Sequence, residues 1–149
     1  MDIHALVVDD SGIMRKMVMR SLSQSGLANF TFTEACDGAD ALEKFDPETI
    51  SMMFVDWNMP NMPGIDLIRA VRSAEVDDHV PIVMITTEST MDKIEEALDQ
   101  AGVDSFIVKP FTVDVLRKKL TPLFEKITAE IEGKSKGGGF FGKLAKAMN

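Results

Sequence analysis

Residues 52–60, MMFVDWNMP, consist of four apolar residues, then an aspartate, then a turn-forming segment that ends in proline. A short apolar run bounded by turn residues is typical of a strand that is buried on both faces of a sheet. Residues 5–10, ALVVDD, and residues 106–109, FIVK, show the same pattern of an apolar run that ends in charged residues. Three strand-like segments therefore each place charged side chains at their carboxyl ends.

The rest of the chain alternates between strand-like and helix-like segments. The predicted strands are residues 3–8, 30–34, 52–55, 81–85 and 105–108. The predicted helices are residues 12–25, 39–45, 64–74, 91–101 and 113–132. Gly26 and Gly102 follow two of these helices, at the position where a left-handed residue commonly ends a helix. The predicted N-caps, all short polar side chains, are Ser11, Asp37, Thr90 and Thr112. Five βα units in succession predict an α/β fold, with a parallel sheet covered by helices on both faces.

The composition suits one domain with its own core, since the chain has 149 residues of which 45% are hydrophobic. No apolar run approaches the ~20 residues that a membrane span needs, and residues 1–4 carry no secretory signal. The one cysteine, Cys36, has no partner for an internal disulfide. We therefore expect a cytoplasmic protein in which Cys36 is a small buried filler.

The net charge of −8 is unevenly distributed. All acidic residues lie within residues 1–132, which we expect to form the domain, and this acidic body argues against nucleic-acid binding. Residues 133–139, GKSKGGG, are typical of a flexible linker. Residues 140–149, FFGKLAKAMN, combine apolar residues and lysines at helical spacing. Four interpretations of this basic amphipathic tail stay open: a partner-docking peptide, a segment that folds back on the body, a membrane-surface anchor, or a disordered end.

The carboxyl ends of parallel strands meet at one edge of an open sheet, where ligands bind in such folds. We therefore expect Asp9, Asp10 and Asp56 to gather there with Lys109. Three carboxylates beside one ammonium repel one another unless a divalent cation joins them, so the cluster predicts a Mg²⁺ and phosphate site. Asp56 is then a candidate carboxylate nucleophile that forms an aspartyl phosphate.

Neighbouring residues supply further groups for such a site. Lys109 offers a point charge to one phosphate oxygen, and Thr86 offers a hydroxyl to another. The carbonyl of Asn58 offers one more oxygen ligand. A cis peptide bond before Pro110 is left open, because only about 5–6% of X–Pro bonds in folded proteins are cis. Trp57 is expected to form a partly exposed wall of the site.

These segments resemble the receiver domain of two-component response regulators. The resemblance rests on residues 7–11 (VVDDS), 55–64 (VDWNMPNMPG), 84–88 (MITTE) and 108–111 (VKPF), and it extends over roughly residues 3–130. It implies a flavodoxin-like, doubly wound sheet of five parallel strands in the order 2-1-3-4-5, with five helices. The chain is most similar to CheY-like single-domain regulators of the chemotaxis type.

The resemblance also implies roles at the matching positions. Asp56 would accept a phosphoryl group from a histidine kinase. Asp9, Asp10, Asp56 and the main-chain carbonyl of Asn58 would bind Mg²⁺ or Mn²⁺. Lys109 would contact the phosphoryl group.

Four further residues match positions that control the signal in this family. Thr86 would contact the phosphoryl group and, with Phe106, would form the switch. Phosphorylation is expected to move Thr86, to turn Phe106 inward, and to change the face formed by the fourth helix, fifth strand and fifth helix. An output protein would bind on that face. Asn58 and Glu88 would tune the rate of dephosphorylation.

We therefore predict a monomeric response regulator of chemotaxis or motility, which is a signalling switch that catalyses only its own phosphorylation and dephosphorylation. A phosphorelay intermediate, which passes the phosphoryl group to another histidine protein, is the first alternative. A phosphohydrolase with an aspartate nucleophile is a weaker one, because Asn58 occupies the position where such enzymes place a second acid. A phosphorylation-independent adaptor is disfavoured, because the set of site residues is complete: Asp9, Asp10, Asp56, Thr86 and Lys109.

Overall fold

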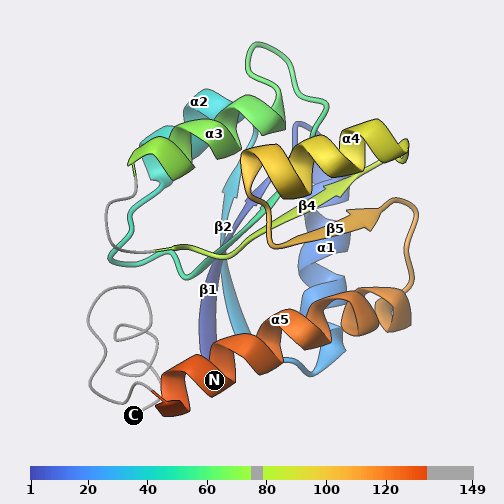
Figure 1. Ribbon diagram of the computed structural model, residues 1–149. Helices are drawn as coiled ribbons and strands as arrows, with labels where there is room; N and C mark the ends of the chain where they lie inside the picture. Colours follow the sequence, from blue (N-terminus) through green and yellow to red (C-terminus); the bar gives the residue numbers. More distant parts are fainter. Residues whose placement is uncertain (75–78, 134–149) are drawn as a thin grey trace.

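The computed structural model describes residues 1–74 and 79–133 (Figure 1). In this described part, the strands form one parallel sheet in the order β2-β1-β3-β4-β5. The strands are β1 (Asp2–Val8), β2 (Asn29–Ala35), β3 (Met52–Val55), β4 (Ile82–Thr86) and β5 (Ser105–Val108). The predicted fold class and strand order are confirmed, and β3 lies at the centre of the sheet.

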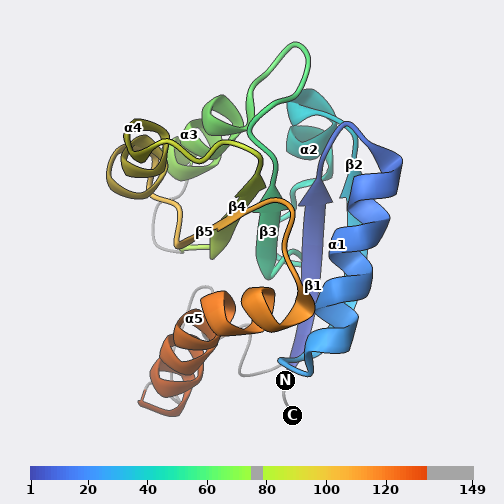
Figure 2. The same cartoon turned by 90° about the vertical axis from the view of Figure 1, so that its right-hand side faces the viewer.

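Helices cover both faces of the sheet (Figures 1 and 2). α1 (Gly12–Ser25) and α5 (Val113–Gly133) pack against each other on one face. α2 (Gly38–Lys44), α3 (Gly64–Ala74) and α4 (Met91–Glu95) cover the other face. None of the helices in residues 1–74 and 79–133 has the length and apolar character that crossing a membrane requires.

Local signals in the sequence set the helix ends. Each predicted N-cap accepts a hydrogen bond from the backbone N–H three residues later, at Ser11, Asp37, Thr90 and Thr112. Gly26 and Gly102 have φ angles of 75° and 80°, in the left-handed region that glycine adopts without strain. The predicted caps and helix stops are therefore confirmed.

The predicted helix 91–101 is only partly α-helical. Its first turn is α4, and the segment then continues as the π-helix η1 (Glu96–Ala101). The N–H of Gly102 donates to the carbonyl of Ala97, five residues earlier, which is the spacing of a π-helical bond. A single π-helical turn has no residue pattern of its own, so the sequence carries no signal for it.

The core lies on both sides of the central strands. Every residue of β3 and β4 is buried, as expected for a parallel sheet with two covered faces. At the β2 edge, Phe30 and Phe32 stack with ring centroids 5.9 Å apart. Phe124 of α5 meets Phe30 edge-on at 6.1 Å, which fixes α5 over this side of the sheet.

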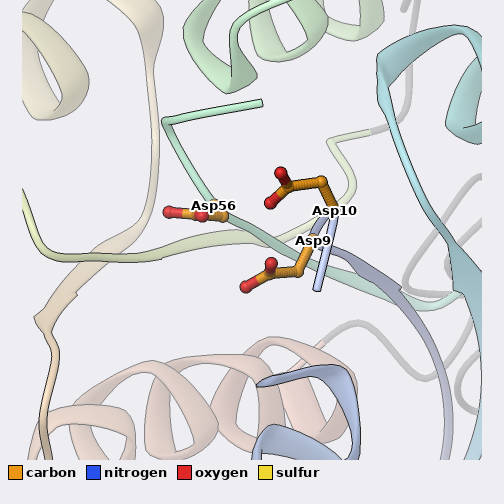
Figure 3. A group of neighbouring side chains, drawn as sticks. All are labelled: Asp9, Asp10 and Asp56. Atoms are coloured by element: carbon orange, nitrogen blue, oxygen red, sulfur yellow. The ribbon is translucent and has the colours of Figure 1, made fainter. Parts of the chain in front are cut away.

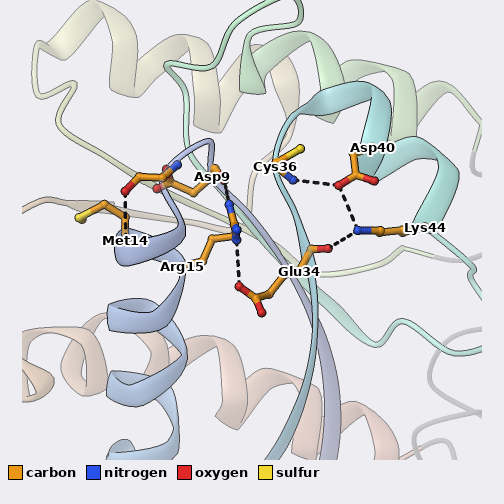
Figure 4. Close-up of polar contacts among 8 residues, drawn as sticks. Asp9, Met14, Arg15, Glu34, Cys36, Asp40 and Lys44 are labelled. Atoms are coloured by element: carbon orange, nitrogen blue, oxygen red, sulfur yellow. Dashed lines mark hydrogen bonds and ion pairs between the residues drawn. The ribbon is translucent and has the colours of Figure 1, made fainter.

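The prediction that Cys36 is buried is wrong, because its side chain is exposed. Cys36 lies in the turn after β2 and not in the sheet. Its backbone N–H donates to the carboxylate of Asp40, which also pairs with Lys44 (Figure 4). The turn is therefore held by α2 through the backbone, and the thiol takes no part in the core.

Candidate functional site

Three carboxylates gather at the carboxyl edge of the sheet (Figure 3). Asp9 and Asp10 follow β1, and Asp56 follows the neighbouring strand β3. The N–H of Asp56 donates to the carbonyl of Val8, at 2.9 Å, and so continues the pairing of the two strands. One oxygen of each carboxylate lies within 4.8 Å of the others. Asp9 and Asp56 are only 3% and 8% exposed, whereas Asp10 is exposed.

Lys109 follows β5 and reaches into the same cluster. Its Nζ donates to Oδ2 of Asp9 at 2.8 Å and lies 3.6 Å from Oδ2 of Asp56. Its backbone N–H donates to the carbonyl of Thr86 at 2.8 Å, and the peptide bond to Pro110 is cis. The buried ammonium thus offsets one of the three neighbouring negative charges.

The surroundings of Asp56 shift its acidity in both directions. Burial raises the pKa of Asp56 above its ordinary value, and the negative charge of Asp9 adds to this effect. The charge of Lys109 and hydrogen bonds from Thr86 and from the N–H of Trp57 lower the pKa, without cancelling the rise. The carboxylate is therefore more basic than an ordinary aspartate, which favours a nucleophilic role.

The donor set suits a hard divalent cation. Such ions take oxygen ligands, and magnesium is usually held by one or two carboxylates together with water and phosphate oxygens. Lys109 leaves most of the charge of the three carboxylates uncompensated, and two of these groups are withdrawn from water. The cluster therefore could hold a divalent metal ion, and the identity of that ion stays a prediction.

Asp9 is also held from outside the cluster, by contacts that sequence reasoning missed. The N–H of Ser11 donates to its Oδ1 at 2.9 Å. Arg15 of α1 donates from Nη1 to the backbone carbonyl of Asp9 at 2.7 Å, and its Nε pairs with Glu34 of β2 at 2.9 Å (Figure 4). Arg15 thus links the start of α1 to the ends of β1 and β2. Its position in the sequence gave no signal, because both partners depend on the tertiary fold.

Gly64 is a second residue whose importance sequence reasoning missed. A Cβ atom at this position would lie 1.9 Å from the carbonyl oxygen of Asp56, so only glycine fits. The N–H of Gly64 donates to the carbonyl of Trp57 at 2.8 Å and closes the loop that carries Asp56. The Pro-Gly pair just before α3 signals a turn, but it does not reveal the close approach to Asp56, which depends on the tertiary fold.

Trp57 does not form a partly exposed wall, and that prediction is wrong. Its side chain is 5% exposed. The Nζ atom of Lys93 in α4 lies 4.7 Å from the centroid of its ring, a cation–π geometry. Trp57 therefore joins the loop after β3 to α4.

The predicted switch and tuning residues lie around this cluster. Thr86 is fully buried at the end of β4 and accepts a hydrogen bond from the N–H of Glu88 at 3.4 Å. Phe106 pairs in register with Met84 of β4 and is 5% exposed, so its ring is already inward in this structure. Asn58 is exposed and Glu88 is half-buried, at the rim of the site. The roles of these residues stay predictions.

Comparisons with known proteins agree with this geometry. The family model of the response regulator receiver domain matches residues 5–121. Over 122 residues the chain is 43% identical to the chemotaxis protein CheY of Pseudomonas aeruginosa, which covers 82% of this chain and 96% of that protein. It is 45% identical over 116 residues to the chemotaxis protein CheY1 of Helicobacter pylori, which covers 77% and 91%. The solved structure of the chemotaxis protein CheY4 of Vibrio cholerae matches with a TM-score of 0.70 and 34% identity, over 82% of this chain and 98% of that one. The chain therefore belongs to the response regulator receiver domains, within which it is CheY-like.

Proposed function

We propose that this chain is a cytoplasmic signalling switch of chemotaxis or motility, in which Asp56 accepts a phosphoryl group from a histidine kinase. One observation carries the proposal: the buried Asp56 carboxylate lies beside two further carboxylates and the ammonium of Lys109. The names of the relatives support the chemotaxis assignment.

Asp9, Asp10, Asp56 and the main-chain carbonyl of Asn58 would hold Mg²⁺ or Mn²⁺. When bound, the ion neutralises negative charge on the phosphoryl oxygens. The ion also explains why three carboxylates stay together at this edge of the sheet, where two of them are buried.

The two oxygens of Asp56 have different surroundings. Oδ1 accepts the N–H of Trp57 at 2.8 Å, whereas Oδ2 faces Lys109 at 3.6 Å. Oδ2 is therefore the nucleophile. It forms a bond to phosphorus while the phosphorus–nitrogen bond of the phosphohistidine breaks, and the donor imidazole keeps that electron pair. Lys109 and the hydroxyl of Thr86 contact the transferred oxygens. Water later attacks phosphorus, the bond from phosphorus to Oδ2 breaks, and inorganic phosphate leaves with Asp56 restored as a carboxylate. Asn58 and Glu88 at the rim tune the rate of that step.

The output face consists of α4, β5 and α5. It carries exposed apolar side chains at Met91, Val108 and Val115, which suit a protein partner. Thr86 ends β4, and Phe106 lies in the neighbouring strand β5. A change at Thr86 and Phe106 therefore reaches this face through adjacent strands, and it shifts the population that binds the output protein.

The test is phosphorylation by acetyl phosphate or by a histidine kinase, followed by mass spectrometry of the intact protein. With Mg²⁺, the wild-type chain should gain one phosphoryl group, and the Asp56→Asn variant should gain none. Chelation of the metal should suppress the gain in the wild type. Equal labelling of both chains, or labelling that is indifferent to Mg²⁺, would contradict the proposal. Onward transfer to a histidine phosphotransferase, faster than loss to water, would favour the relay intermediate.

A further inference from the structure

A groove of about 340 Å³ lies between α5 and the start of β1. It is therefore at the amino-terminal end of β1, whereas Asp56 follows the carboxyl end of β3. Met1 and Leu27 form one wall, and Phe124 and Ala129 of α5 form the other. Met1 is anchored through its carbonyl, which accepts the N–H of Asn29 at 2.8 Å. We call this the α5–β1 groove. Figures 1 and 2 show that the chain begins beside α5.

The groove is built by a part of α5 that extends past the receiver-domain match. That match ends at residue 121, whereas α5 continues to Gly133. The extension is packed against the body, since Phe124 and Ile127 are buried and Phe124 contacts Phe30. The apolar floor of the groove is therefore a stable feature of the fold, and it lies beyond the residues that the family model matches.

We infer that residues 140–149 of the same chain occupy the α5–β1 groove. This segment contributes Phe140, Phe141 and Leu144 to an apolar face, with Lys143 and Lys146 beside it. Ten residues are too few for a stable isolated helix, so such a segment folds only against a surface. The inference does not depend on the phosphoryl chemistry proposed above.

Charge favours this occupant. The rim of the groove carries Glu125 and Glu132, both exposed, and they outnumber the positive α-amino group of Met1. Residues 134–149 carry four lysines and no acidic residue. The lysines of the segment therefore meet an acidic rim while its aromatic residues cover the apolar floor.

The length of the chain also fits. Six residues, 134–139, separate the end of α5 from Phe140, and an extended chain of that length spans up to about 20 Å. Glu125 lies about 10 Å back along α5 from Glu132, at 1.5 Å per helical residue. The segment can therefore turn back and run along α5. A short tether also gives it a high effective concentration at the groove.

A second groove, of about 230 Å³, flanks the other side of α5 and is a poorer match. Its charged lining is mixed, with Lys126 and His79 beside Glu130 and Asp104. A lysine-rich segment gains less electrostatic attraction there than at the α5–β1 groove, where both charged side chains are acidic. This second groove supplies the control positions for the test.

The test is paramagnetic relaxation enhancement in the full chain. Cys36→Ser removes the native exposed thiol, and Asn149→Cys carries a nitroxide without changing any apolar residue or lysine of the tail. With the oxidised nitroxide, the amide signals of Leu27 and Thr128 should lose most of the intensity that they have after the label in the same sample is reduced. The reduced spectrum also reports whether each variant is folded.

Charge reversal sharpens this test. The double variant Glu125→Lys and Glu132→Lys should restore the Leu27 and Thr128 signals, whereas the matched change Glu130→Lys in the second groove should leave them broadened. Unbroadened signals at Leu27 and Thr128, or broadening centred on Asp104, would overturn the inference. So would broadening that appears equally when labelled and unlabelled copies are mixed, since the occupant would then be a second copy.

Discussion

At Gly64, the absence of a Cβ atom allows the loop that carries Asp56 to close against the start of α3. Gly64→Ala should destabilise the protein by about 1–3 kcal/mol, the usual cost of overpacking, because the new Cβ would overlap the carbonyl of Asp56. Denaturation in urea measures this change. Gly133→Ala is the matched control, since no atom lies within 4 Å of a Cβ there. Equal stability of the two variants would contradict the close approach at Gly64.

The raised pKa of Asp56 predicts a pH-dependent gain in stability on substitution. Because the folded state disfavours the ionised carboxylate, Asp56→Asn should raise the free energy of unfolding at neutral pH in buffer without divalent cations. The gain should vanish as the pH falls below about 3.9, the ordinary aspartate value, where the wild-type carboxyl is protonated in both states. Thermal unfolding across this range measures it. A variant less stable than wild type at pH 7 would show that Asp56 is stabilised as an anion.

The charged residues at the strand ends could be predicted from the sequence, because they directly follow the apolar runs that form the strands. Asp56 and Lys109 each follow an apolar run, and the parallel pairing of the strands brings their carboxyl ends, and so these two side chains, together. Burial could not be predicted for residues in turns. Trp57 is covered by Lys93 from a distant helix, and Cys36 is turned outward by the loop between β2 and α2.

Among the elements, Asp104 joins α3 to the starts of β4 and β5. Its oxygens accept hydrogen bonds from Arg72 at 3.0 Å and from the N–H of Ile82 at 2.8 Å, and they pair with His79 at 2.9 Å. Burial raises its pKa, but the bonds from His79 and Ile82 and the charges of His79 and Arg72 outweigh this effect, so its pKa lies below the ordinary value.

Asp104→Asn should therefore cost about 1.5–3 kcal/mol at neutral pH, the range for hydrogen bonds to charged groups. The difference from wild type should shrink as the pH falls below about 3.9 and through the lower folded pKa, because Asp104 then loses its charge. Urea unfolding at several pH values measures this trend. Asp114→Asn removes a largely exposed ion pair with Arg117 and should change stability little. A pH-independent loss at Asp104 would contradict the electrostatic account.

The contact between Lys93 and Trp57 attaches α4 to the loop that carries Asp56. Lys93→Met keeps the aliphatic chain and removes the charge, so it should cost about 0.5–1 kcal/mol and alter the emission of the single tryptophan. Lys93→Arg should preserve both properties, since arginine also stacks on aromatic rings. Lys44→Met, on α2, is the distant control. Identical emission from Lys93→Met and wild type would exclude the contact in solution.

Helix ends could be predicted more reliably than helix type. Ser11, Thr90 and Gly102 act through backbone contacts within a few residues, which the sequence displays directly. The π-helical turn of η1 depends on packing against its neighbours, and Glu96 in that turn pairs with Arg69 of α3 at 3.1 Å. No local pattern encodes such a distant partner.

At the scale of the whole molecule, the alternation of strands and helices predicts a parallel sheet, whereas the strand order came from the family resemblance. The order matters because it places β3 beside β1 and so brings Asp56 to Asp9. The inward position of Phe106 could not be predicted, since it depends on packing between β4 and β5. Residues 75–78 and 134–149 lie outside the described residues, so the predicted roles of the tail stay predictions there.

The central claim is that the acidic cluster binds a divalent cation next to a carboxylate that accepts a phosphoryl group. Its most direct test is a crystal structure of the chain grown with Mn²⁺ and beryllofluoride, a phosphoryl mimic, with anomalous scattering to locate the metal. The account predicts one manganese peak at the cluster of Asp9, Asp10 and Asp56, beside the main-chain carbonyl of Asn58, and beryllofluoride bonded to Oδ2 of Asp56. A manganese peak elsewhere, or beryllofluoride absent from Asp56 while the metal is bound, would contradict it.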